Sequence, residues 1–307
     1  MTDSTGQAGR DAFGAASTAD EVLAGIDLTG RTVMVTGGYS GLGLAASRAL
    51  AAAGARVVVP ARRPDVARGA LAGIEGVEVE ELDLADLDSV RAFSERFQRR
   101  HAAIDVLIAG AAIMACPETR VGPGWEAQFA TNHLGHFALT QLLWPTLTAA
   151  GNARVVAVSS GYNSDWKIRW DDMQFAQGYD KWAAYGQSKL ANILFARHLD
   201  GLGARSGVHA FSVNPGWIMT SLQRHLTVAE MTAAGWLDDD GTPKPELFKS
   251  PEQGAATVVW AATSHQLDDH GGAYCADCRI TEGPPDSDEA ASLWAVSTKL
   301  TGLDLIS

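Results

Sequence analysis

The sequence lacks the features that mark secreted, disulfide-rich and membrane-spanning proteins. Its 307 residues include only three cysteines, Cys116, Cys275 and Cys278, which are too few for a disulfide framework. No apolar run approaches the roughly 20 residues that a membrane-spanning helix needs. Residues 1–20 lack the basic start and the apolar stretch of a signal peptide. We therefore expect a cytoplasmic protein with no membrane partner.

Basic residues are also scarce in this chain. It has 24 lysines and arginines against 36 acidic residues, which gives a formal charge of −12. That balance disfavours binding to duplex nucleic acid or to anionic lipid. Hydrophobic residues make up 46% of the chain and charged residues 20%, which is typical of a globular protein rather than a disordered one. We expect no nucleic-acid partner.

Short apolar runs alternate with segments of helical periodicity from residue 28 onward. This alternation indicates βαβ units and a parallel sheet that is buried on both faces. We predict a single doubly wound, Rossmann-type α/β domain over residues 28–307, with helices on both faces. Residues 1–27 have few large apolar groups and are predicted to form a flexible arm. The expected strands are 32–35, 56–59, 77–82, 104–108, 154–158 and 208–213, and the expected helices are 42–53, 86–100, 124–147 and 182–199.

The stretch at about 219–250 interrupts this alternation with polar, irregular sequence. It follows the expected strand that ends at Val213. Ligands of open α/β sheets bind beyond the carboxyl ends of the strands, so a segment here is placed to cover a substrate. We interpret it as a substrate lid; the alternative is a decorated surface loop.

A glycine-rich loop, Thr36-Gly37-Gly38-Tyr39-Ser40-Gly41-Leu42-Gly43, lies between the first expected strand and the first expected helix. Glycines there allow the backbone to turn tightly and to approach a phosphate, while the helix N-terminus supplies free N–H groups and a partial positive charge. The loop indicates dinucleotide binding. The alternative is an ordinary tight turn, which also uses glycine.

The end of the second strand indicates which dinucleotide is bound. NAD-preferring proteins of this architecture carry an acidic residue there, which bonds the ribose 2′-hydroxyl. In this chain Val59 is followed by Pro60, Ala61, Arg62 and Arg63, with no carboxylate. A guanidinium suits a 2′-phosphate, so Arg62 favours NADP over NAD. The alternative is that both arginines are merely solvated.

Tyr185 and Lys189 lie four residues apart in an expected helix, so their side chains share one face. A nearby cation favours the phenolate form of a tyrosine. Ser159 and Ser160 end the strand 154–158, at the edge of the sheet where a ligand would bind. Each feature alone is common, but the ordered set of glycine loop, serine and Tyr–Lys helix is not. The set indicates an acid–base site.

With these motifs the chain resembles the short-chain dehydrogenases/reductases from about residue 28 onward. Further matches are Asp83-Leu84 after the third strand, Asn132 in Thr-Asn-His-Leu-Gly-His-Phe, and Asn214-Pro215-Gly216 with Thr220. The resemblance implies that Ser160 bonds the substrate oxygen, Tyr185 exchanges its proton and Lys189 holds the nicotinamide ribose and depresses the tyrosine pKa. It makes Asn132 the anchor of a water in the proton relay, so the expected catalytic residues are Ser160, Tyr185, Lys189 and Asn132. The expected cofactor-binding residues are Gly37, Tyr39, Ser40, Gly41, Leu42, Gly43, Arg62, Asp83, Leu84, Ala109, Gly110, Tyr185, Lys189, Pro215 and Thr220.

The spacing of 25 residues between Ser160 and Tyr185, and the run from Ser188 to Phe195, resemble the retinol-dehydrogenase-like branch. We carry over the architecture of that branch and not its retinoid substrate. One departure concerns the usual Asn-Asn-Ala-Gly after the fourth strand, because this chain has Ala109-Gly110-Ala111-Ala112 there. The loss of the two amides makes Ala109 a less secure cofactor contact than Gly41.

The expected activity is NADP-dependent hydride transfer between the nicotinamide and a hydrophobic ketone, aldehyde or secondary alcohol. The resemblance also implies a homodimer or homotetramer. One alternative is a non-catalytic dinucleotide-sensing regulator on the same fold, and another is an epimerase or dehydratase. No metal is expected, since Cys275 and Cys278 have no second pair. His133 and His136 are expected to have packing or surface roles rather than catalytic ones, and Trp166, Trp170 and Trp182 either line the substrate pocket or fill the core.

Overall fold

The computed structural model describes residues 13–238, 240–285 and 288–306. Strands and helices alternate along the chain as expected. The strands in this part are β1 (Thr32–Thr36), β2 (Arg56–Ala61), β3 (Val77–Glu81), β4 (Val106–Ala109), β5 (Arg120–Val121), β6 (Trp125–Glu126), β7 (Ala153–Val158), β8 (Val208–Asn214), β9 (Tyr274–Ala276) and β10 (Arg279–Ile280). The α-helices are α1 (Ala19–Leu23), α2 (Gly41–Ala52), α3 (Pro64–Ala70), α4 (Leu87–Arg100), α5 (Ala127–Phe129), α6 (Gly135–Leu142), α7 (Trp144–Ala149), α8 (Lys181–Gly203), α9 (Val228–Ala233), α10 (Pro251–Thr263) and α11 (Glu289–Thr301).

The main sheet of the described residues has eight strands in the order β10-β9-β8-β7-β4-β1-β2-β3. All neighbouring strands are parallel except β9 and β10, which form an antiparallel pair. The chain runs outward from β1 to β3 and then returns to the other side of β1 at β4. The strand order therefore reverses between β1 and β4, and the crevice beyond their carboxyl ends is where such sheets bind ligands.

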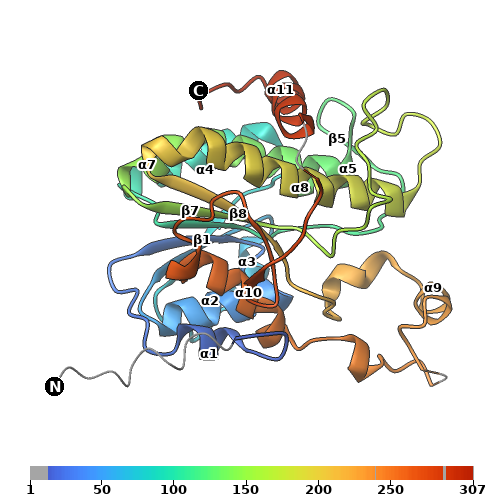
Figure 1. Ribbon diagram of the computed structural model, residues 1–307, viewed down its shortest axis with the longest axis horizontal. Helices are drawn as coiled ribbons and strands as arrows, with labels where there is room; N and C mark the ends of the chain where they lie inside the picture. Colours follow the sequence, from blue (N-terminus) through green and yellow to red (C-terminus); the bar gives the residue numbers. More distant parts are fainter. Residues whose placement is uncertain (1–12, 239, 286–287, 307) are drawn as a thin grey trace.

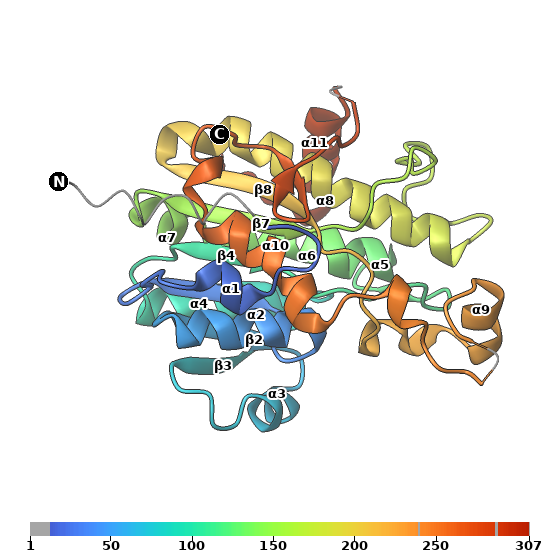
Figure 2. The same ribbon diagram turned by 60° about the horizontal axis from the view of Figure 1, so that its bottom comes forward.

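Helices cover both faces of the sheet (Figures 1 and 2): α1, α2 and α10 lie on one face, and α4, α6 and α8 on the other, with α11 outside α8. The side chains of β1 show how the strand serves both layers. Val33 and Val35 belong to the apolar cluster with α2 and α10, while Met34 belongs to the cluster with α4 and α8. Burial on both faces explains the continuous apolar runs in the sequence. The predicted α/β class is confirmed.

The arm predicted for residues 1–27 differs from the structure in its second half. Residues 1–12 lie outside the described residues, but helix α1 packs against α10 with Ala19, Val22 and Leu23 buried. The helix begins with a capping box, in which the Thr18 hydroxyl accepts from the Glu21 N–H and the Glu21 carboxylate accepts from the Thr18 N–H. Composition alone hides this short apolar face, because alanine and threonine dominate around it.

The helix expected over 124–147 is divided into several pieces. Trp125–Glu126 forms β6, which pairs with β5, and α5 then leads into a π-helical turn, η1 (Ala130–Leu134). Helix α6 ends at Leu142, and α7 restarts with Pro145 in its first turn, where proline is tolerated. No helix in the described ranges is long and apolar enough to cross a membrane.

Candidate active site

A cavity of about 840 Å³ opens beyond the carboxyl ends of the parallel strands. It is lined by residues from the glycine loop, the ends of β2, β4 and β7, helix α8 and the segment after β8. Of the residues predicted from the sequence, Asn132 and Ala109 do not line it. Those that do are Gly37, Tyr39, Ser40, Gly41, Leu42, Gly43, Arg62, Asp83, Leu84, Gly110, Ser160, Tyr185, Lys189, Pro215 and Thr220.

The glycine loop packs so closely that side chains at its glycines would collide with neighbouring atoms, and two of these glycines also have a backbone conformation that favours glycine. A Cβ atom added at Gly43 would lie 2.4 Å from the carbonyl oxygen of Gly37, and one at Gly37 would lie 2.9 Å from the Cα of Ala111. Gly37 and Gly41 also have φ values of 71° and 52°, which L-residues rarely adopt. The loop thereby exposes its backbone at the N-terminus of α2, as binding of a pyrophosphate requires.

A hydrogen-bonded brace replaces the side-chain amides that the Ala109-Gly110 sequence lacks. The N–H groups of Gly110 and Ala111 donate to the Thr36 hydroxyl at 2.9 and 3.1 Å. The Thr36 hydroxyl also contacts His136 Nε2 at 2.8 Å, and His136 Nδ1 donates to the Asn132 carbonyl at 3.0 Å. Burial lowers the pKa of His136 to about 4, so the ring is neutral and Nε2 accepts. The expected packing role of His136 thus includes fixing the ends of β1 and β4.

Asn132 lies in the π-helical turn, with a side chain that is 0% exposed. Its amide forms two hydrogen bonds of 2.9 Å with the backbone of Ile113, one as donor and one as acceptor, and a third to the Ser188 hydroxyl. Ile113 itself lines the cavity. In this geometry the Asn132 side chain positions the wall of the site rather than facing the cavity.

Tyr185 is 7% exposed and reaches the cavity from α8. Burial raises the pKa of its phenol to about 12, and the hydrogen bond with Ser160 opposes that shift. Ser160 rather than Ser159 is free for this contact, because the Ser159 hydroxyl donates to the Lys189 carbonyl at 2.7 Å. At neutral pH the phenol therefore keeps its proton, as a general acid must.

Lys189 is 3% exposed and donates from Nζ to the carbonyl oxygen of Val158 at 3.0 Å. Nζ lies 5.7 Å from the centroid of the Tyr185 ring. Burial lowers the pKa of Lys189 to about 8. Burial shifts the pKa of the Tyr185 phenol upward, so the depression by Lys189 that the resemblance implies stays a prediction.

An aromatic wall combines Trp166 and Trp182, which were predicted to line the pocket or fill the core, with Trp217, Trp236 and Phe248 from the stretch after β8, which were not predicted. Trp236 lies 5.9 Å from Trp217, 6.1 Å from Trp182 and 6.2 Å from Phe248, between ring centroids. All four rings line the cavity, as does Trp166. Trp170 does not line it, and its indole N–H donates to Glu289. The pairing of Trp217 with Trp236 depends on contacts between distant segments, which spacing alone does not reveal.

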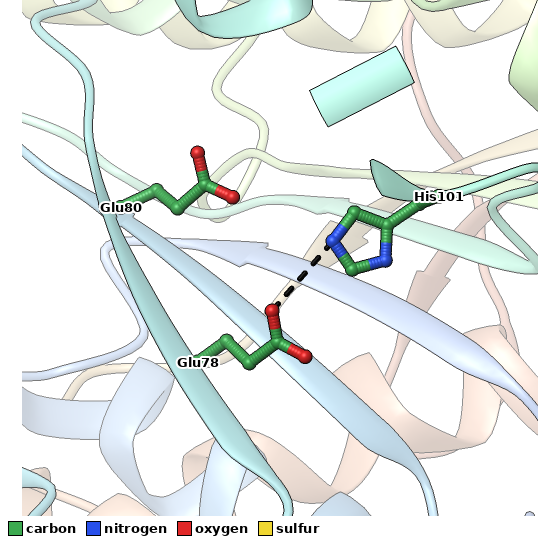
Figure 3. A group of neighbouring side chains, drawn as sticks. All are labelled: Glu78, Glu80 and His101. Atoms are coloured by element: carbon green, nitrogen blue, oxygen red, sulfur yellow. Dashed lines mark ion pairs between the residues drawn. The ribbon is translucent and has the colours of Figure 1, made fainter. Parts of the chain in front are cut away.

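One group of side chains has the composition of a metal site. Glu78 and Glu80 of β3 lie beside His101 (Figure 3), with donor atoms within 4.8 Å of one another. Arg100, however, bonds Glu80 at 2.6 Å and Glu78 at 3.0 Å, so a metal ion would face a guanidinium already in place. The group acts as an ion-pair network that ties α4 to the edge strand. Cys275 and Cys278 are buried free thiols.

Residues 31–230 match the family model of the short chain dehydrogenases. A "Probable oxidoreductase" of Streptomyces lividans is 45% identical over 275 residues, which cover 86% of this chain and 90% of that protein. Human retinol dehydrogenase 14 is 36% identical over 301 residues, which cover 89% of this chain and 87% of that protein.

Solved structures agree with these relatives. The crystal structure of an uncharacterised protein from Mycobacterium paratuberculosis has a TM-score of 0.75 and 33% identity, covering 96% of this chain and 99% of that one. A Beutenbergia cavernae protein, provisionally assigned as an NAD(P)-dependent gluconate 5-dehydrogenase and holding NADP, has a TM-score of 0.63 and 27% identity, covering 82% and 96%. The chain is therefore an oxidoreductase of the short-chain dehydrogenase/reductase family, in its retinol-dehydrogenase-like branch.

Proposed function

We propose that the protein is an NADP-dependent oxidoreductase that interconverts a hydrophobic ketone or aldehyde and its alcohol. The observation that carries this proposal is the convergence of Ser160, Tyr185 and Lys189 on the cavity that also contains the glycine loop. A dinucleotide fits the residues present, since the glycine loop leaves its backbone exposed to the cavity and has no room for side chains: a Cβ at Gly43 would press on the Gly37 carbonyl oxygen. When bound, the nicotinamide supplies or accepts the hydride.

The chain's own residues handle the oxygen and its proton. In the reductive direction the Ser160 hydroxyl orients the carbonyl oxygen and the Tyr185 phenol, protonated at neutral pH, gives that oxygen its proton. The bond from Lys189 Nζ to Val158 occupies one of the three ammonium protons, which leaves donors for the ribose of the cofactor. Turnover of ketones and aldehydes, followed by nicotinamide absorbance, tests this assignment. Dinucleotide binding without turnover would favour the sensing alternative.

The aromatic wall supports the hydrophobic class of substrate. Trp166, Trp182, Trp217, Trp236 and Phe248 border the cavity beside the catalytic tyrosine, and rings of this kind bury large apolar areas. We propose the cytoplasm as the compartment, since Cys116, Cys275 and Cys278 are free thiols. A homodimer or homotetramer is proposed from the habit of the family alone, and sedimentation would test it.

The preference for NADP gives a measurable prediction. We expect the Michaelis constant for NADPH to be lower than that for NADH by very roughly 10- to 100-fold, because charge-assisted bonds from Arg62 reach only the 2′-phosphate. Replacing Arg62 with alanine should weaken the binding of NADPH and leave the binding of NADH nearly unchanged. Equal weakening of both cofactors would mean that Arg62 packs against the adenine. The surface variant Arg205→Ala serves as the control.

The proposed lid over 219–250 gives a second prediction. The described part of this segment contains a 3₁₀ turn, η3 (Ser221–His225), helix α9 and a 3₁₀ turn, η4 (Pro245–Leu247), while Asp239 lies outside it. Helix α9 stands out from the body of the molecule in both views (Figures 1 and 2). We expect chymotrypsin to cleave this segment at least about threefold more slowly with cofactor and substrate than without them. Equal rates would identify it as a surface loop.

A further inference from the structure

The first turn of the proposed lid rests directly on the glycine loop. The hydroxyl oxygens of Ser221 and Ser40 are 2.9 Å apart. A Cβ added at Gly41 would lie 2.9 Å from the methyl group of Thr220. Turn η3 is therefore held at the N-terminus of α2, beside the place where a dinucleotide would bind.

This turn brings a third arginine, Arg224, to the cavity that Arg62 and Arg63 line. Arg224 donates from Nη1 to the Ser221 carbonyl at 3.0 Å, which leaves the other guanidinium protons available. Among the described residues no ion pair is found for any of the three arginines, although acidic residues outnumber basic ones by 36 to 24. Clustered guanidinium groups without carboxylates indicate a site for an anion.

Burial lowers the pKa of Arg224, and repulsion by Arg62 and Arg63 lowers it further. Tyr39 of the glycine loop lines the same cavity as Arg224. A pyrophosphate at the N-terminus of α2 is served by backbone N–H groups. The anion shared by Arg62 and Arg224 is therefore better matched by a phosphate on the adenosine ribose.

We propose that Arg224 is a second contact for the 2′-phosphate of NADP and acts as a latch for the lid. The like charges of Arg224 and Arg62 repel each other, and a phosphate placed between them attracts both. The phosphate that distinguishes NADP from NAD thereby stabilises the position of the lid in which turn η3 rests on the glycine loop. This inference rests on the proposed NADP-dependent function, and it adds a residue from the lid to the site.

Binding measurements test the contact. By calorimetry, Arg224→Ala should weaken NADP⁺ by about 5- to 20-fold, as expected for a partly solvated charge-assisted bond, and NAD⁺ by less than about twofold. Arg224→Lys should recover part of the loss, and Arg205→Ala, an exposed arginine in another turn, should change neither. Equal weakening of NADP⁺ and NAD⁺, or no weakening of either, would overturn the inference.

A second readout follows the lid itself, without turnover. Adenosine 2′,5′-bisphosphate should slow chymotrypsin cleavage between residues 217 and 248 in the wild type and in Arg205→Ala, but not in Arg224→Ala; adenosine 5′-monophosphate should protect none of them. Chymotrypsin cuts after aromatic residues, so the substitution removes no cleavage site. Protection that persists in Arg224→Ala would refute the latch.

The Arg62→Ala variant separates the two proposals. If Arg62→Ala weakens the binding of NADP⁺ but not of NAD⁺, and Arg224→Ala shows no such selective loss, the proposed function stands and the latch fails. If neither substitution weakens the binding of NADP⁺ more than that of NAD⁺, the proposed preference for NADP is wrong, and the latch is then wrong as well.

Discussion

Replacing Tyr185 with phenylalanine is expected to reduce turnover by about 10²–10⁴-fold, the range of general acid–base catalysis. The ring of Tyr185 is buried, and phenylalanine preserves its packing while removing the hydroxyl that bonds the Ser160 side chain and carries the proton. Cofactor affinity should change by less than about twofold, because the phenol is not the main holder of the dinucleotide in this site. Steady-state kinetics and calorimetry on one preparation measure both quantities.

A matched control is Tyr179→Phe. Tyr179 is also partly buried, and its hydroxyl bonds the Cys116 carbonyl at 3.0 Å, but the residue does not line the cavity. This variant should lose stability through unpaired polar groups and retain turnover. More than about a tenth of wild-type turnover in Tyr185→Phe would contradict the assignment of the acid.

The fold could be predicted because its strands and turns have recognisable local sequence patterns. β1, β2 and β7 are continuous apolar runs, which parallel strands buried on both faces require, and glycines follow β1 where the chain turns into α2. The capped helix α1 was missed, since its apolar face consists of only a few residues and its stability comes from packing against α10.

The site was predictable where its residues are neighbours in sequence. Tyr185 and Lys189 lie four residues apart on one helix face, and the structure brings both to the same cavity. The direction of the Tyr185 pKa was not predictable, because it depends on how fully the folded chain excludes water from the phenol. Arg224 and Trp236 reach the cavity through an irregular segment, where neither period nor motif fixes the direction of a side chain.

The brace around Thr36 shows a further limit of sequence reasoning. The missing amides at Ala109 and Gly110 suggested a weakened cofactor contact, yet the N–H groups of Gly110 and Ala111 bond the Thr36 hydroxyl, which in turn contacts His136. His136 lies 26 positions after Gly110 in the sequence, because 136 − 110 is 26. His136 also bonds the carbonyl of Asn132 in the π-helical turn at 130–134, a kind of turn that helix propensities do not predict.

Replacing Gly43 with alanine is expected to weaken binding of either dinucleotide by at least about tenfold, the second-largest effect predicted for this chain. The added Cβ would lie 2.4 Å from the Gly37 carbonyl oxygen and 3.0 Å from its carbon, so the backbone of the loop must shift. Backbone cannot yield as a flexible side chain can, and a small displacement of the N–H groups that cradle a phosphate costs much of the binding energy.

Gly69→Ala is the matched control for this substitution. Gly69 lies inside helix α3, and a Cβ there meets no atom within 4 Å, so the exchange should stabilise the helix by about 0.5–1 kcal/mol. Because the steric conflict at Gly43 concerns backbone common to NAD and NADP, Gly43→Ala should weaken both cofactors alike, unlike Arg62→Ala. Calorimetric titration of the two glycine variants with each cofactor measures this. Wild-type affinity in a folded Gly43→Ala protein would show that the loop tolerates the shift and that the dinucleotide is held elsewhere.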